Sequence, residues 1–295
     1  MSDNIRSQTI RDVSDTALWI AACRAQESER EDAVFKDRWA RKLAGERGIE
    51  MVAEMPHSED MAFAMVMRTV AIDRLVSSAI AQGVDTVLNL GVGLDTRPYR
   101  MELPSHLRWI EVDREPLLSY KSEILDAEEP VCRLQRISCD LADEECRGRL
   151  FRELVEETEN ALVITEGVIG YLTNDQAARL SQDLYAIPAL RYWILDYSQG
   201  RRRRNRHVKD VARKIRDSAP WQFSMTDPID FFRSHGWEIR QNIFILDQAD
   251  RLGRPLPLTF PWSVLMVLFP RKIREIGNKT FGYAMLGKSV AAAGG

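Results

Sequence analysis

The sequence predicts an α/β protein whose central sheet is doubly wound and mostly parallel, and three observations support this prediction. Short apolar segments, typical of buried parallel strands, recur five times along the middle of the chain. Stretches with helical spacing separate these segments, and strands that alternate with helices pair in parallel through right-handed crossovers. A chain of 295 residues, 45% of them hydrophobic, can bury the core that such a sheet requires.

The expected strands are short apolar runs, and the first of them ends at a glycine, as a buried strand leading into a tight turn does. The five expected strands comprise residues 86–90, 109–112, 134–137, 161–165 and 192–195. The helices expected between them comprise residues 117–126, 144–158 and 175–187.

The residues before the first strand are expected to form a helical extension. Apolar residues with helix-type spacing cover 16–31 and 34–44. A longer helix is expected over 58–82, because Ser58 is a good helix cap and Gly83 a good helix stop.

The last hundred residues no longer alternate between strand and helix. A basic helical stretch at 201–216 and an amphipathic one at 263–276 accompany two further strands, near 237–245 and 280–286. These late strands can pair antiparallel at one edge of the sheet, which then has seven strands.

Composition and charge are those of an ordinary globular protein, expected to be cytoplasmic. Lys and Arg number 41 against 44 Asp and Glu, a net charge of −3. No apolar run approaches the ~18 residues of a membrane-spanning helix, and the polar N-terminus is unlike a secretory signal, so no membrane partner is expected. The cysteines form no C-x-x-C pair, and we expect reduced, partly buried thiols and no metal site. The four cysteines are Cys23, Cys132, Cys139 and Cys146.

Acidic residues follow the expected strands at the ends where an open α/β sheet binds its ligand. Asp95 lies in the turn after the first strand, Asp113 closes the second, Asp140 follows the third and Glu166 follows the fourth. The carboxyl ends of parallel strands meet at one edge, beside the point where the strand order reverses. Carboxylates there disfavour a phosphate, so we expect a hydroxyl-rich ligand without one.

The turn after the first strand contains a glycine pair, Gly91 and Gly93. Glycine lets the backbone approach a ligand closely, because it has no Cβ. The turn departs from the dinucleotide fingerprint G-x-G-x-x-G, since Thr96 occupies the third glycine position. A tight strand–helix turn without a ligand remains an alternative for the glycine pair taken alone.

S-adenosylmethionine meets these requirements, because it carries ribose and adenine but no phosphate. Asp113 lies 22 positions after Gly91, close to the spacing of ~20 residues expected for a carboxylate that binds ribose hydroxyls. Asp140 can accept a hydrogen bond from the adenine amino group. Arg68 and Arg24 are candidates for the carboxylate of the methionine end, with a solvated helix face as the alternative for each.

Two motifs resemble the leucine carboxyl methyltransferase family: LNLGVGLDTRPYR at residues 88–100 and EGVIGYL at residues 166–172. That family includes enzymes that methylate the C-terminal leucine of a protein and polyketide carboxyl methyltransferases of the tetracenomycin type, and the latter branch is the expected one. The resemblance extends over most of the chain, from residues 16–27 to Phe281-Gly282-Tyr283. It implies a class I methyltransferase with a Rossmann-like sheet.

The resemblance also implies how the chain is organised. Residues 1–83 would form a helical region that contributes to the cofactor and substrate site, and residues 84–200 the cofactor-binding α/β core. Residues 201–295 would supply a helical lid and the strands that complete the sheet. The three parts would form one compact domain.

The family's cofactor contacts imply roles for particular residues. Arg68 and Arg24 would hold the methionine carboxylate, and Glu166 would face the methionine amino group. The remaining contacts would come from the glycine turn (Gly91, Gly93), from Asp113 at the ribose, and from Asp140 and Leu141 around adenine. Asp95 and Arg97 would brace the loop. Tyr171 would orient the acceptor, with a packing aromatic as its alternative role.

The implied reaction is methyl transfer to a carboxylate oxygen of a small, polyketide-like or amino-acid-derived acid. An ionised acceptor needs little acid–base help, which agrees with histidines in four unrelated contexts. The residues Met61, Met65, Met67, Trp221, Phe223, Phe231, Phe232 and Trp262 could line a greasy pocket or belong to the plain core. The alternatives are a protein C-terminal or tRNA carboxyl methyltransferase, a nicotinamide-dependent oxidoreductase and a non-catalytic binding module.

The basic stretch 201–216 carries nine cations and one acid. It can be a solvated helix, a lid that attracts an anionic substrate, or a nucleic-acid contact. Nucleic acid is the least favoured of the three, because the rest of the chain is acidic and contains no recognised RNA-binding module.

Overall fold

A computed structural model describes residues 13–54, 58–155, 158–198, 221–257 and 262–289. The basic stretch 201–216 lies outside these ranges, so its expected helix and lid are not described.

A single seven-stranded sheet forms the centre of the molecule, in the order β3-β2-β1-β4-β5-β7-β6. The strands are β1 (Thr86–Leu90), β2 (Arg108–Asp113), β3 (Arg133–Ser138), β4 (Ala161–Thr165), β5 (Leu190–Ser198), β6 (Trp237–Phe244) and β7 (Phe281–Lys288). The first five pair in parallel, and β7 is antiparallel to both β5 and β6. The predicted doubly wound, mostly parallel sheet is therefore confirmed, and the strand order reverses between β1 and β4.

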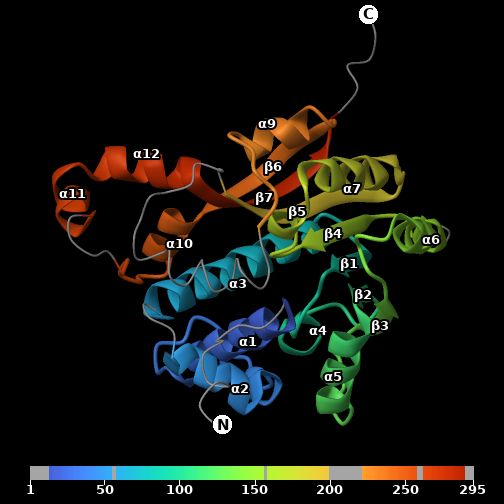
Figure 1. The fold of residues 1–295 in the computed structure, drawn as a ribbon, viewed down its shortest axis with the longest axis horizontal. Coiled ribbons are helices and arrows are strands. Elements are labelled where there is room, and N and C mark those ends of the chain that lie inside the picture. Colours follow the sequence, from blue (N-terminus) through green and yellow to red (C-terminus); the bar gives the residue numbers. More distant parts are fainter. Residues whose placement is uncertain (1–12, 55–57, 156–157, 199–220, 258–261, 290–295) are drawn as a thin grey trace, which may run out of the picture.

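Helices cover both faces of the sheet (Figure 1). Before the sheet come α1 (Val13–Glu29), α2 (Ala40–Glu54) and α3 (Ser58–Ala81), and within it α4 (Arg97–Arg100), α5 (Glu115–Leu125), α6 (Glu144–Val155), the short 3-10 turn η1 (Ile169–Tyr171) and α7 (Asn174–Ala186). The later helices are α9 (Pro228–Arg233), α10 (Ile245–Arg251), α11 (Trp262–Leu268) and α12 (Pro270–Thr280).

Two apolar cores lie on opposite faces of the sheet. On one face, side chains of α6, α7 and α9 pack against alternate strand residues such as Leu88 and Trp193. On the other face, α3 packs against Val87 and Ile164. A third cluster joins α1 and α2 to α4 and α5, and in Figure 1 α1 and α2 lie beyond α3 as a separate layer. The α3 helix is therefore held between the sheet and the N-terminal helices.

Two of the predicted helices are wrong in extent. The spacing at 34–44 predicts a helix, but α2 begins only at Ala40, because the Asp37 carboxylate accepts from the backbone N–H groups of Trp39 and Ala40 and so starts the helix there. The amphipathic stretch 263–276 is two helices, α11 and α12, because Pro270 opens the second one.

The two late strands are confirmed as an antiparallel pair, with one addition. They are not both at the edge of the sheet: β7 lies between β5 and β6, so the last strand of the chain is an interior one. The edge strand on this side of the sheet is therefore β6, and β7 joins it to β5.

The cysteines differ from the expectation of four free thiols. Cys139, directly after β3, is paired in a disulfide with Cys146 of α6, whereas Cys23 and Cys132 are free and buried. Equal sequence spacing could not reveal this pair, because contact depends on how the segment between β3 and α6 turns back on itself.

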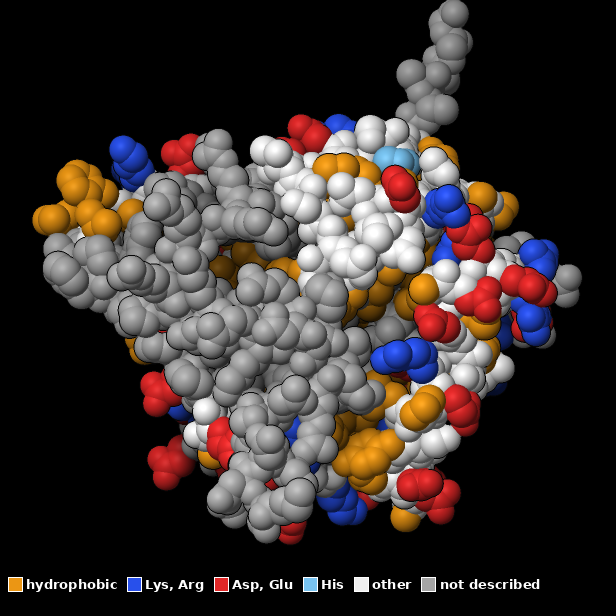
Figure 2. Space-filling model, in the orientation of Figure 1, with side chains coloured by type: hydrophobic (Ala, Val, Ile, Leu, Met, Phe, Trp, Pro, Cys, Tyr) orange, Lys and Arg blue, Asp and Glu red, His pale blue; other side chains and the backbone are white. Residues whose placement is uncertain are grey.

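Charges of both signs are interspersed on the right-hand side of the described surface, and an apolar cluster lies at the opposite end, where Figure 1 places α11 (Figure 2). Within the ranges that the structure describes, no helix is both long enough and apolar enough to cross a bilayer.

Candidate functional site

A cavity of about 400 Å³ opens at the carboxyl ends of the parallel strands, where the strand order reverses. Its walls combine segments that are far apart in the sequence, from α1 and α3 to the turns after β1, β2, β3 and β4 and the last residues of β5. All eight residues predicted to bind the cofactor line it: Arg24, Arg68, Gly91, Gly93, Asp113, Asp140, Leu141 and Glu166. The structure thus brings together the residues that the sequence and the resemblance singled out.

The glycine turn forms the floor of the cavity. Gly91 and Gly93 have φ of 65° and 53°, in the left-handed region that disfavours other residues. A Cβ added to Gly91 would lie 2.5 Å from Cγ2 of Val168, which lines the same cavity. Glycine is therefore required at position 91 both by the backbone and by the space above it.

Asp113 joins the second strand to this turn. One of its carboxylate oxygens, Oδ2, accepts a hydrogen bond of 2.8 Å from the backbone N–H of Gly93, and Oδ1 accepts one from Arg114. The carboxylate also borders the cavity. Asp113 thus holds the turn in shape from the position where a ribose-binding carboxylate is expected.

A second wall follows β3. Asp140 is exposed, and its Oδ1 accepts from the backbone N–H of Ala142. The carbonyl oxygen of Leu141 accepts a 2.8 Å hydrogen bond from Arg147, a buried residue of α6 that also pairs with Asp183 of α7. This segment is therefore tied to two helices rather than left as a free loop.

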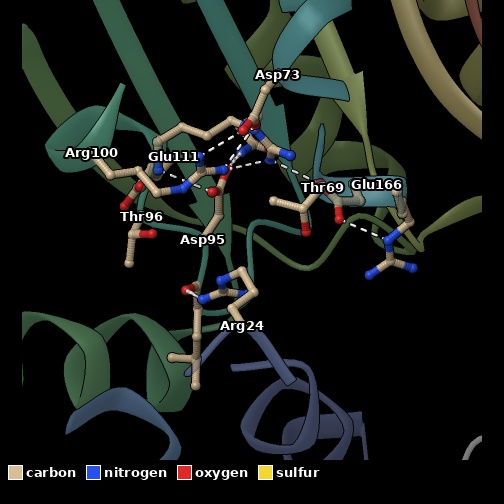
Figure 3. A network of polar contacts seen from close by, with 12 residues as sticks. Arg24, Thr69, Asp73, Asp95, Thr96, Arg100, Glu111 and Glu166 are labelled. Carbon is tan, nitrogen blue, oxygen red and sulfur yellow. Dashed lines mark hydrogen bonds and ion pairs between the residues drawn. The ribbon is translucent and has the colours of Figure 1, made fainter. Parts of the chain in front are cut away.

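A buried ionic network supports the turn between β1 and α4 (Figure 3). The guanidinium of Arg97, only 2% exposed, lies within 2.7–2.8 Å of three carboxylates, those of Asp73, Asp95 and Glu166. Arg100 also pairs with Asp73 through two nitrogens, at 2.6 and 2.8 Å. Asp95 and Arg97 brace the loop, as the resemblance implies.

Arg68 projects from α3 toward two acids at the ends of neighbouring strands. Its Nε donates to Glu166 at 2.8 Å, and one terminal nitrogen lies 3.8 Å from Oδ2 of Asp196. The other oxygen of Asp196 accepts a 2.7 Å hydrogen bond from the backbone N–H of Gly167. Both oxygens of Glu166 are engaged, one by Arg68 and one by Arg97.

Arg24 is held differently from Arg68. Its Nε donates to Asp37 at 2.9 Å, and one terminal nitrogen donates to the carbonyl oxygen of Leu94 at 2.6 Å. Asp37 also accepts a hydrogen bond from Thr96, the residue at the third glycine position of the fingerprint. Arg24 therefore borders the cavity, and two of its guanidinium nitrogens already donate hydrogen bonds to protein acceptors.

The arginines control the ionisation of these acids. Burial alone would raise the pKa of Glu166, but the adjacent Arg97 and Arg68 outweigh it and lower that pKa. The pKa values of Asp73 and Asp95 are also lowered against burial, by Arg100 and Arg97 in both cases. At Asp196 burial prevails over Arg68, and the pKa is raised.

We expect the protein to lose stability in acid because of this network. A group whose pKa is lower in the folded state contributes stability above its unfolded pKa of ~4, and loses it as the pH falls through the folded pKa. For Asp73, Asp95 and Glu166, the free energy of unfolding should therefore fall as the pH drops below 4. Asp196 acts in the opposite direction.

Urea titrations at pH 7, 5, 4 and 3 measure this dependence. Replacing Asp196 with asparagine should make the loss in acid steeper, because it removes the one opposing group in the network. A free energy of unfolding that stays constant from pH 5 to pH 3 would contradict the assignment.

The cavity lining also includes apolar and aromatic side chains. Met61 and Met65 of α3 belong to it, together with Trp221, Phe223 and Tyr171. The segment that carries Trp221 and Phe223 is attached to η1, because the backbone N–H groups of residues 222 and 223 both donate to the carbonyl oxygen of Gly170. The cavity therefore presents apolar side chains as well as charged ones to a ligand.

Some of the expected pocket residues lie elsewhere. Met67 is a core residue, and Phe231 and Phe232 pack behind Phe223 rather than in the cavity. The side chain of Trp262 falls outside the described residues. His106 and His235 do not line the cavity. The other two histidines, His57 and His207, fall outside the residues that the structure describes.

Two acids of the site, Asp196 and Asp37, are not among the residues predicted from the sequence. Asp196 directly follows the fifth expected strand, so the rule that found Glu166 after the fourth strand would also have found it. No local signal marks Asp37, whose partners Arg24 and Thr96 are distant in the sequence.

The sheet order and the acid-rimmed cavity around a tight glycine turn define a class I methyltransferase, with S-adenosyl-L-methionine as its cofactor. A model of the leucine carboxyl methyltransferase family matches residues 17–184. Because this match covers more than half of the chain, the protein belongs to the leucine carboxyl methyltransferase family. The nicotinamide-dependent alternative is thereby excluded.

Individual relatives agree with this assignment. A Streptomyces avermitilis protein named as an S-adenosyl-L-methionine-dependent methyltransferase is 31% identical over 260 residues, covering 82% of this chain and 88% of the relative. A Frankia alni protein with the same type of name is 29% identical over 252 residues, covering 82% and 87%.

Solved structures share the fold. A Thermobifida fusca protein described as a methyltransferase aligns with a TM-score of 0.58 at 17% identity, covering 96% of this chain and 97% of that one. A DUF574 family protein from Streptomyces avermitilis aligns with a TM-score of 0.53 at 15% identity, covering 91% and 96%.

Proposed function

We propose that the protein transfers a methyl group to a carboxylate oxygen of a small, largely apolar acid, as in the biosynthesis of a secondary metabolite. The observation that carries this proposal is the composition of the cavity wall. The glycine turn and the acids line the same cavity as the apolar side chains of Met61, Met65, Trp221 and Phe223. Family membership supports a carboxylate as the acceptor group.

We assign the contacts to the nucleoside part of the cofactor to polar residues and a leucine that border the cavity. Asp113 would accept from the ribose hydroxyls, and Asp140 with Leu141 would frame adenine. A close approach over the glycine turn is possible because position 91 has no Cβ.

The methionine end is assigned to the charged residues on the other side of the turn. Arg68 would hold the methionine carboxylate, and Glu166 would accept from the amino group with its remaining lone pairs. Arg24 would assist Arg68 with the part of its guanidinium that Asp37 and Leu94 leave available.

S-adenosyl-L-methionine supplies an electrophilic methyl group on a sulfonium. An acceptor carboxylate is already ionised at neutral pH, so the protein need not remove a proton from it. What the chain contributes is position and exclusion of water, and alignment of two reactants can supply ~7–11 kcal/mol of the barrier. We assign orientation of the acceptor to Tyr171, which lies on the cavity wall at the end of η1, the turn that follows β4.

Methyl transfer from radiolabelled cofactor to a set of apolar carboxylic acids tests the proposed function. We expect a labelled product that releases methanol under mild base, as a methyl ester does. Label found only in polypeptide would identify a protein C-terminal methyltransferase, and label found only in RNA a tRNA-modifying enzyme. Either result would overturn the small-molecule proposal.

Replacing Asp113 with alanine is expected to weaken binding of S-adenosylhomocysteine by about 1–3 kcal/mol, or roughly 5- to 150-fold. The change removes the proposed ribose contact and also the hydrogen bond that holds Gly93. Isothermal titration calorimetry measures the affinity directly. The matched control is Glu115→Ala, which removes an exposed acid at the start of α5. This variant should bind S-adenosylhomocysteine as wild type does. Equal affinity in Asp113→Ala and wild type would refute the assignment.

A further inference from the structure

The corner between α11 and α12 exposes three large apolar side chains in succession. Val267, Leu268 and Phe269 are 80%, 61% and 55% exposed. The other exposed large hydrophobic side chains in the described ranges are Val131, 41% exposed, and Trp221, 61% exposed, and they stand on two separate segments. Figure 2 shows the apolar cluster at the far end of the molecule, where Figure 1 places α11. Such a concentration of exposed apolar surface marks an interaction site.

Cations follow this apolar corner directly. Arg271 and Lys272 open α12 and are exposed, and within the described residues neither has an acidic partner in an ion pair. Arg274, one turn further, pairs with Asp247 and Asp250 of α10. By sequence α12 carries four cations against one acid, Glu275. The corner therefore combines an apolar tip with a positively charged base.

We propose that this corner, residues 267–272, inserts into the surface of a lipid bilayer that contains anionic headgroups. Apolar side chains of such an element enter the boundary between headgroups and acyl chains, while Lys and Arg remain at the level of the phosphates. Anionic lipid attracts basic residues close to its surface. The order of the residues fits this arrangement, because the apolar tip comes first and the cations lie behind it.

A second copy of the chain fits the corner less well. Two-fold pairing through this patch would place Arg271 and Lys272 of both copies close together, which is repulsive. Three side chains also offer much less area than the ~800 Å² per partner of a stable protein interface. A bilayer requires neither a matching pocket nor a large flat area.

This proposal changes the expectation of no membrane partner, which rested on the lack of a spanning segment. Contact at the surface needs no spanning helix. It would bring the protein to a phase in which apolar acids concentrate. The inference does not depend on the identity of the acceptor, since binding is measured without turnover.

Sedimentation of the full chain with vesicles tests the proposal. The probes are vesicles of phosphatidylcholine alone and of phosphatidylcholine with 30% phosphatidylglycerol. We expect wild type to bind the anionic vesicles, and Leu268→Ser/Phe269→Ser to reduce the ratio of bound to free protein at least about tenfold. Arg271→Glu/Lys272→Glu should remove the preference for anionic over neutral vesicles and flatten the salt dependence.

The matched control is Val131→Ser/Arg133→Glu, which makes the same kinds of change at another exposed position. It should bind as wild type does. The control matters because the basic stretch 201–216 can adsorb to anionic vesicles by charge alone, and only insertion depends on the apolar tip. Binding by Leu268→Ser/Phe269→Ser equal to wild type would overturn the proposal, as would no binding of wild type to either vesicle.

A second measurement reports insertion itself. Leu268→Cys can be labelled selectively with an environment-sensitive nitrobenzoxadiazole dye, because the two free cysteines are buried. Blue-shifted, brighter emission with anionic vesicles is the expected result, and unchanged emission would contradict insertion. Sedimentation equilibrium that shows a dimer dissociated by Leu268→Ser/Phe269→Ser would instead identify a second copy as the occupant and overturn the proposal.

Discussion

Replacing Arg97 with methionine is expected to lower the free energy of unfolding by about 3–5 kcal/mol, because it removes a cation that three carboxylates share and leaves the buried Asp95 without an ion-pair partner among the described residues. Arg97 is within 2.8 Å of Asp73, Asp95 and Glu166, and it is almost inaccessible to water. Methionine preserves much of the volume, so the lost charge dominates the effect. Urea denaturation at pH 7 measures the change.

The control for this experiment is Arg149→Met on α6, where an exposed arginine lies 3.9 Å from an exposed Glu145. Exposed pairs of this kind contribute little, so the urea midpoint should not move measurably. The loss in Arg97→Met should also shrink in acid, where the three carboxyls become protonated and no longer need the cation. A loss that is equally large at pH 7 and pH 3 would show that packing, not charge, explains the effect.

Replacing Gly91 with alanine is expected to weaken the binding of S-adenosylhomocysteine about a hundredfold, or about 2.8 kcal/mol. The new methyl group would lie between Val168 and Leu141, two residues of the cavity wall, where the cofactor is proposed to approach the turn. The methyl would also be 2.5 Å from Val168, and φ is positive, so stability should fall as well. Calorimetry on the folded fraction separates the two effects.

Gly83→Ala is the matched control for position 91. Gly83 also has a positive φ, 90°, but a Cβ there meets nothing within 4 Å. This variant should lose stability through backbone strain and bind S-adenosylhomocysteine as wild type does. If Gly91→Ala lost no more affinity than Gly83→Ala, the proposed approach of the cofactor to the turn would be wrong.

The central strands β1 and β4 could be predicted from the sequence because they are buried on both faces. A strand such as β4 must be apolar throughout, and its length and its flanking polar residues then define its ends. The helices that pack on the sheet follow equally well from their periodicity. These features depend only on residues close to one another in the chain.

Features that depend on distant residues could not be predicted in this way. The contacts of Asp37 with Arg24 and Thr96 arise only once three segments distant in the sequence lie side by side. The interior place of β7 depends on pairing with both β5 and β6. The break at Pro270, in contrast, was readable from the proline itself.

The candidate site shows the same division. The acids at the strand ends could be found because parallel strands deliver their carboxyl ends to one edge. The way in which Arg97 shares three carboxylates could not, because Asp73 comes from α3 and Glu166 from the turn after β4. Local sequence therefore indicates which residues gather at the cavity, while their partners are set by tertiary packing.

The interior position of β7 bears on how the protein is made. Residues 281–288 are synthesised after β5 and β6, yet β6 pairs only with them in the sheet. During synthesis one side of β5 therefore stays unpaired, and β6 has no neighbouring strand, until residues 281–288 have left the ribosome. Nascent chains stalled before residue 281 should bind chaperones that recognise exposed strand edges, whereas chains from which residues 281–288 have emerged should not.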